Sequence, residues 1–118
     1  MSVDLNQDAI YRPRKGLMVQ HNMIFADYSN VHNALEDPSF EFPSPEDVAI
    51  MVSNRGLLFE LNLLGAFVWE MIDGIHTIAD IENSVTAMFD IDKQAAHEDL
   101  IELVGSMIEF GLIDQVTS

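Results

Sequence analysis

The stretch from residue 48 to residue 61 constrains the fold most, because its apolar pattern predicts a β-hairpin. Large apolar side chains recur at every second position of 48–52 and of 57–61, which is the period of a half-buried strand. The tripeptide Asn-Arg-Gly at 54–56 separates the two runs and has the composition of a tight turn, since glycine takes a positive φ without strain. We therefore expect two antiparallel strands that meet at this turn.

Two helices are expected after the hairpin, each with its own start signal. Asn62 suits the N-cap of a first helix over 63–72, since its side chain can accept a hydrogen bond from a free amide of the first turn. The Asp-Gly pair at 73–74 is a typical helix stop. Thr77 followed by Asp80 resembles a capping box, which predicts the start of a second helix.

A third helix is expected between Asp92, a good N-cap, and Gly111, a typical C-terminal residue. Each helix carries an apolar stripe at helical spacing, which indicates one buried face. The expected core residues are Leu64, Phe67, Val68, Met71, Ile78, Ile81, Val85, Phe89, Leu100, Leu103, Val104 and Met107, with Leu112 and Ile113 closing over them. Strands followed by helices predict an α+β fold, winged-helix-like, with about three N-terminal β-strands and a three-helix bundle.

The segment before the hairpin has a weaker pattern. Leu-Met-Val at 17–19 predicts a first strand, residues 23–25 are compatible with its extension, and residues 30–35 are compatible with a short turn of helix. The whole stretch 21–47 contains three prolines and only scattered apolar residues. We expect it to be a long loop that is either functional or poorly ordered.

A single domain is expected from the length of 118 residues. Residues 1–15 have the composition of a mobile acidic tail with a basic end, since three of the five basic residues lie between 12 and 15. Residues 16–118 are expected to form the folded domain, with the 21–47 segment as an extended loop.

Twenty acidic residues against five basic ones give a formal charge of −15, which argues against nucleic-acid binding. DNA-binding domains neutralise phosphates with Lys and Arg, and such a basic surface is missing here. The acidity either serves solubility or attracts a basic peptide or a basic enzyme surface. The chain has no apolar run of membrane-spanning length, no signal-peptide pattern and no cysteine, so we expect a cytoplasmic protein without a membrane partner.

Catalytic residues, metal ligands and bound cofactors are not expected. His21, His32, His76 and His97 are scattered and lack the spacing of metal ligands. The serines have no histidine partner in a recognisable nucleophile motif, and there is no glycine-rich phosphate loop. The sequence therefore gives no support to an enzyme.

Several short motifs occur in an order that resembles the PqqD-like family, over residues 47–113. They are Glu60-Leu61-Asn62 at a strand end, Gly65-Ala66 before an apolar-Trp69-Glu70 helix, Asp73-Gly74, and a closing Gly111-Leu112-Ile113. Members of this family, also called RiPP recognition elements, hold the leader segment of a ribosomally made precursor peptide while a partner enzyme modifies the core. The resemblance implies the same winged-helix-like architecture and a peptide chaperone whose partner is often a radical S-adenosylmethionine (SAM) enzyme.

The resemblance also implies that the leader peptide adds as a strand along 57–61 and packs against the third helix. A strand edge offers unpaired N–H and C=O groups, and neighbouring apolar pockets select side chains. On that helix His97, Ile101 and Ile108 form an arc beside the core-facing one, next to Gly105. A glycine inside a helix costs up to about 1 kcal/mol, which a closely approaching backbone would explain. The predicted peptide-binding residues are Leu57, Leu58, Phe59, Glu60, Leu61, His97, Ile101, Gly105 and Ile108.

Other interpretations stay open at this point. Ile101 and Ile108 could instead pack beneath the 21–47 segment. The same scaffold also serves transcriptional regulators, although the negative charge disfavours that function. A third function is that of a self-associating interaction subunit, a homodimer paired through its edge strand, and it is compatible with peptide binding.

Overall fold

The computed structural model describes residues 6–44 and 46–116, which form two compact units. The sheet unit is Gly16–Glu70, and the terminal unit combines the described residues up to Lys15 with those from Met71 onward. The fold is α+β, as expected, with antiparallel strands ahead of three successive helices.

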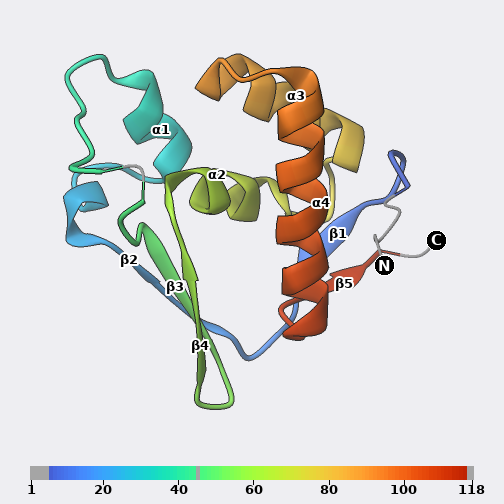
Figure 1. Ribbon diagram of the computed structural model, residues 1–118. Coiled ribbons are helices and arrows are strands. Elements are labelled where there is room, and N and C mark those ends of the chain that lie inside the picture. Colours follow the sequence, from blue (N-terminus) through green and yellow to red (C-terminus); the bar gives the residue numbers. More distant parts are fainter. Residues whose placement is uncertain (1–5, 45, 117–118) are drawn as a thin grey trace. The chain divides into compact units, whose positions relative to one another are not determined.

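The sheet unit is built on a three-stranded antiparallel sheet. Its order is β2-β3-β4, with β2 at Met18–His21, β3 at Ile50–Asn54 and β4 at Leu57–Leu61. Figure 1 shows β3 and β4 as a long hairpin, with β3 between β4 and β2. The predicted first strand and the predicted hairpin are confirmed.

The turn of the hairpin lies within the predicted Asn-Arg-Gly tripeptide and has two residues in its bend, because Asn54 still pairs with Leu57. Arg55 has a φ of 52° and Gly56 a φ of 84°, so both lie in the left-handed region. Positive φ at both positions is the signature of the turn type whose twist matches paired strands. Glycine adopts this conformation freely, whereas arginine does so at a cost.

The helix α2, Leu63–Met71, follows β4 directly. As predicted, Asn62 caps it: the Asn62 side chain accepts a 2.9 Å hydrogen bond from the backbone N–H of Gly65. The Nε2 atom of His21 on β2 lies 4.0 Å from the Glu70 carboxylate. This contact brings α2 to the face of the sheet on which His21 lies.

The 21–47 segment contains secondary structure rather than a long irregular loop. A 3-10 helix, η1, covers Met23–Phe25, and α1 covers Val31–Glu36. The expected strand extension at 23–25 is wrong, because the Asn22 side chain accepts a 3.0 Å hydrogen bond from the backbone N–H of Ile24 and starts a helical turn instead. The expected helical turn at 30–35 is confirmed as α1.

Aromatic side chains give this segment a small core of its own. The ring centroid of Phe25 lies 5.3 Å from that of Phe40 and 5.6 Å from that of Phe42, and Tyr28 packs edge-on against Phe40. The Tyr28 hydroxyl donates a 2.8 Å hydrogen bond to Asp37, and this bond raises the pKa of Tyr28. Stacked rings of this kind add to the stability gained from their burial.

In the terminal unit, α3 covers Ile78–Phe89 and begins at the predicted capping box. The Thr77 hydroxyl accepts a hydrogen bond from the Asp80 backbone N–H, and the Asp80 carboxylate accepts one from the Thr77 N–H, both at 3.1 Å. Two amides of the first turn are thereby satisfied.

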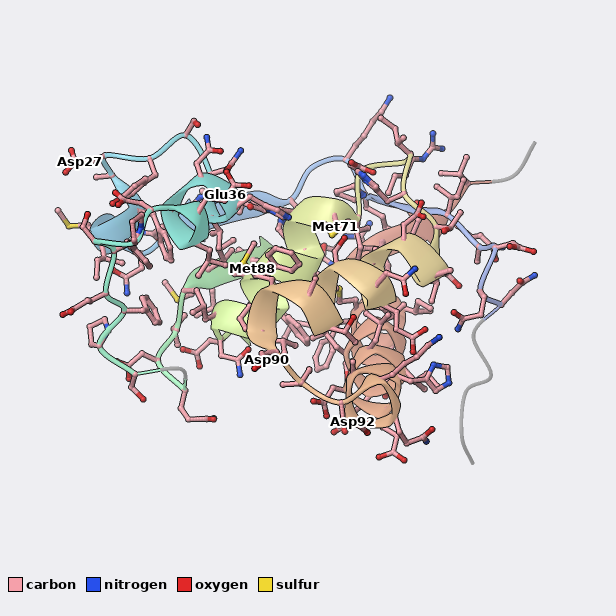
Figure 2. The ribbon with its side chains drawn as sticks, turned by 90° about the horizontal axis from the view of Figure 1, so that it is seen from above. Asp27, Glu36, Met71, Met88, Asp90 and Asp92 are labelled. Carbon is pink, nitrogen blue, oxygen red and sulfur yellow. The ribbon has the colours of Figure 1, made fainter. Side chains whose placement is uncertain are left out.

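The helix α4, Lys93–Glu109, follows α3 after a short turn. Figure 2 shows Asp90 and Asp92 at this turn, one at the end of α3 and the other at the start of α4. Asp90 takes a φ of 49°, and Asp92 caps α4 as predicted by accepting hydrogen bonds from two backbone amides. No helix formed by the described residues is long and apolar enough to cross a membrane.

The predicted core residues of the three helices lie inside the protein. Leu64, Phe89 and Leu103 are half-buried, and the other nine are buried. The closing pair Leu112 and Ile113 is also buried, with 1% and 2% exposure. Helical periodicity therefore located the core.

A second, two-stranded sheet was not predicted. In the terminal unit, β1 (Tyr11–Pro13) pairs antiparallel with β5 (Ile113–Gln115). Arg14 and Asp114 extend this contact with a 2.8 Å ion pair. Of the expected tail, residues 1–5 lie outside the described residues, whereas the chain at 11–13 is part of a sheet.

Candidate functional site

β4 is a free edge of the sheet. Among the described residues of the sheet unit it pairs with β3 alone, so its outer side presents N–H and C=O groups that β3 does not satisfy. Leu57 and Leu58 on this strand are 60% and 64% exposed. Natural edge strands are commonly protected by charge, proline or a bulge. An apolar edge such as this one is suited to pairing with another extended strand.

The register divides the side chains of β4 between two faces of the sheet. Leu61 is buried and Phe59 is half-buried, and they lie opposite Ile50 and Val52, which are fully buried. These residues mark the core face. Because successive side chains of a strand alternate, Leu58 and Glu60 belong to the other face.

That other face, called the open face below, is formed by two cross-strand rows. Its members on β2 and β4 are exposed, and those on the central strand β3 are half-buried. The rows are Leu58–Ser53–Met18 and Glu60–Met51–Gln20. The open face therefore offers an apolar row and, beside it, a row that ends in a carboxylate at the free edge.

Glu60 has no basic partner among the described residues. It lies opposite Met51, and none of the ion pairs involves it. The segment Gly16–Glu70 contains eight acidic residues and one basic residue, Arg55 in the hairpin turn. The edge of β4 therefore presents an unpaired negative charge in acidic surroundings.

α4 in the terminal unit carries the remaining predicted site residues. Ile101 and Gly105 are half-buried and Ile108 is 40% exposed, whereas the core-facing residues Leu100, Val104 and Met107 are buried. The arc next to the core-facing one is thus partly open. The groove between β4 and this arc stays a prediction.

His97, also predicted to contact the peptide, pairs with a buried carboxylate. Its Nδ1 atom lies 2.8 Å from Glu82 of α3, and Glu82 is only 4% exposed. Glu82 was missed by the sequence analysis, although its position four residues after Ile78 places it on the inner side of α3. The pair joins α3 to α4, so His97 has a structural task whatever its role in binding.

A second carboxylate fixes the 21–47 segment. Glu70 of α2 accepts hydrogen bonds from the backbone N–H groups of Val31 at 2.8 Å and His32 at 3.1 Å. The Nδ1 atom of His32 lies 2.8 Å from the same carboxylate, and its ring stacks on Phe67 with centroids 4.1 Å apart. Phe67 and Glu70 are one helical turn apart on α2, so the sequence places them on the same side of the helix, where both contact His32.

The histidines pair with single carboxylates rather than forming clusters. His21 and His32 both approach Glu70, and His76 lies 2.8 Å from Asp73. Within residues 6–44 and 46–116, no three His, Cys, Asp or Glu side chains are grouped so that they could hold a metal ion.

A protein-family model described as coenzyme PQQ synthesis protein D (PqqD) matches residues 47–113, more than half of the chain. The match spans β3, β4, α2, α3 and α4, and leaves out β2 and the 21–46 part of the preceding segment. Comparisons with the curated proteins and with the solved structures found no match.

Proposed function

The chain belongs to the PqqD family, and we propose that it is a non-catalytic adaptor that binds the leader segment of a ribosomally synthesised precursor peptide. Family membership supports a role in precursor-peptide biosynthesis, together with a peptide and a biosynthetic enzyme as partners. The observation that carries the proposal is the exposed edge of β4, with Leu57 and Leu58 uncovered.

The leader would bind by strand addition. Hydrogen bonds to the backbone of β4 would fix an extended peptide, and side chains beside the strand would choose its sequence. The half-open arc of α4 formed by Ile101, Gly105 and Ile108 supports this mode, since it offers apolar surface on a helix. In this proposal the arc and β4 together form the groove for the peptide, in a winged-helix-like arrangement.

Presentation of the leader to a modifying enzyme would follow. A strand-shaped peptide held along its backbone leaves the rest of the precursor extended and accessible. In our proposal the enzyme is a radical SAM enzyme, and the complex forms in the cytoplasm.

A titration followed by NMR tests this function. The probe is the leader half of the short precursor encoded beside the gene, added to the isotope-labelled full chain. We expect amide shifts in residues 57–61 and 101–108. A peptide that the partner enzyme modifies, yet which leaves the amides of 57–61 unmoved, would overturn the proposal.

Two matched variants separate the edges of the sheet. Leu58→Asp on β4 should weaken leader binding about tenfold or more, because it places a desolvated charge beside the added strand. Met18→Asp changes an exposed residue of the opposite edge strand on the same open face, and should leave binding unchanged. Equal losses in both variants would argue against β4 as the binding edge.

Self-association through β4 is a second use of the same edge, and the exposed Leu57 and Leu58 favour it. Sedimentation of the full chain over a range of concentrations would reveal a dimer. If the dimer uses β4, the leader peptide should dissociate it, and Leu58→Asp should abolish it. A dimer that survives both treatments would use another surface.

A further inference from the structure

We infer that Glu60 makes this adaptor selective for a peptide that carries a basic residue, with an apolar residue two positions away. The inference rests on the proposed strand addition to β4 and concerns the part of the peptide that faces the open face. It names the substrate class as an extended segment with the pattern basic-x-apolar, read in either direction.

The first step follows from strand geometry. In an added strand the side chains alternate, so every second one points to the open face. The residue that pairs with Glu60 lies on the same face as Glu60, and the residue two positions along lies beside Leu58. This holds for parallel and antiparallel addition alike, so the spacing does not depend on the direction of the peptide.

The second step is the electrostatics of the row that ends at Glu60. Behind this carboxylate lie Met51 and then Gln20, neither of which is charged. A basic side chain on the added strand would therefore be the first cation to lie directly opposite it in the sheet. Opposite charges at such positions attract, and like charges repel. An acidic side chain there would meet Glu60 within a unit that already has a large excess of acidic residues.

The third step is the apolar row beside it. Leu58 is 64% exposed at the edge of this row. An apolar side chain of the added strand would cover part of Leu58, and the contact would remove apolar surface of both side chains from water. Leu58 and Glu60, at the edge ends of the two rows, thus select two neighbouring open-face residues of the peptide by different physical means.

Selection from a displayed library tests the inference without a known precursor. The probe is a library of random peptides of about ten residues, long enough to pair with all five residues of β4. It is selected separately against the wild-type chain, Glu60→Lys and Glu41→Lys. Glu41 is exposed in the same unit, so its variant makes the same change in net charge away from β4.

We expect peptides selected by the wild type and by Glu41→Lys to be enriched in Lys or Arg two positions from an apolar residue. Those selected by Glu60→Lys should carry Asp or Glu instead. For a synthetic pair that differs only at this position, the wild type should prefer the basic peptide by about two- to fivefold, and Glu60→Lys should reverse the preference.

The outcomes distinguish failure of this inference from failure of the proposed function. Peptides that shift the amides of 57–61 but show no basic preference, or a preference that Glu60→Lys does not change, overturn this inference and leave the proposed function standing. Failure to enrich any peptide, or enriched peptides that leave those amides unmoved, overturns both. A preference that disappears equally in Glu41→Lys reflects net charge alone and overturns the role of Glu60.

Discussion

Glu70 on α2 accepts a 2.8 Å hydrogen bond from the backbone N–H of Val31 at the start of α1. The same carboxylate accepts a hydrogen bond from the backbone N–H of His32 and contacts the ring of this residue. Glu70 lies within the region that matches the PqqD family, whereas α1 lies before it. One side chain of the region that matches the family model thus holds a helix that precedes this region.

Replacing Glu70 with alanine should destabilise the sheet unit. The change leaves two backbone amides and a half-buried imidazole without their acceptor, and an unsatisfied buried donor costs about 1–3 kcal/mol. We expect Glu70→Ala to lower the free energy of unfolding by an amount in this range. Urea unfolding followed by the fluorescence of the single tryptophan, the buried Trp69, measures it.

Glu36→Ala is the matched control, since Glu36 is an exposed carboxylate at the other end of α1. It should change the free energy of unfolding by less than about 0.5 kcal/mol. Equal effects of the two substitutions would show that Glu70 contributes through helix propensity or net charge, and not through the hydrogen bonds to α1.

Most elements of the C-terminal half could be predicted because their signals act over a few residues. Asn62, Thr77 and Asp92 each accept hydrogen bonds from amides two or three positions later. The Asn-Arg-Gly turn and the apolar stripes are equally local. Such signals specify helices and hairpins without knowledge of the tertiary fold.

Features that depend on distant residues were missed. β1 and β5 have three residues each, too few to show alternation, and Arg14 pairs with a residue 100 positions away. The buried Glu82 and the anchoring Glu70 look like surface residues until their histidine partners, 15 and 38 positions away, are known. The open face became visible only when the strand register placed Glu60 opposite Met51.

The pair formed by His97 and Glu82 predicts a dependence of stability on the charge of Glu82. His97→Ala removes the partner of a buried carboxylate, which should cost about 1–3 kcal/mol, less than for a fully enclosed pair because the imidazole is partly exposed. Adding Glu82→Gln should recover part of this loss, since a neutral amide is easier to bury than a carboxylate.

Urea unfolding of the two single variants and of the double variant measures this coupling as a double-mutant cycle. Strictly additive effects would show that Glu82 is satisfied without His97. Leader binding measured on the same variants separates the two tasks of the histidine, because a purely structural His97 leaves the affinity of the folded protein unchanged.

The hairpin turn predicts opposite effects at its two residues. Gly56→Ala should lower the free energy of unfolding by about 1 kcal/mol, because a Cβ at this φ is strained although it would meet no atom within 4 Å. Arg55→Asn should raise it by about 0.5 kcal/mol, since asparagine tolerates a positive φ better than arginine. Arg55→Gln also removes the charge but keeps the poor preference, and should have little effect. If Arg55→Gln raises the free energy of unfolding as much as Arg55→Asn does, the effect comes from the lost charge and not from the backbone conformation.

Asp73 predicts a loss of stability in acid. Its partial burial favours the neutral form, but hydrogen bonds from the backbone N–H groups of His76 and Ile75 and from the His76 ring outweigh this and lower the pKa of Asp73 below its ordinary value of 3.8. A folded-state pKa below the unfolded one contributes stability that is present above pH 3.8 and is lost as the pH falls through the folded value. Asp73→Asn should therefore reduce stability at neutral pH by about 0.5–1 kcal/mol and match the wild type in strong acid.

Asp99→Asn is the control, since it removes one exposed charge from α4. Its free energy of unfolding should differ from that of the wild type by a constant amount across this range of pH. Urea unfolding at each pH measures these free energies of unfolding. If the values for Asp73→Asn also differ from those of the wild type by a constant amount, the turn after α2 is not stabilised by the ionised carboxylate.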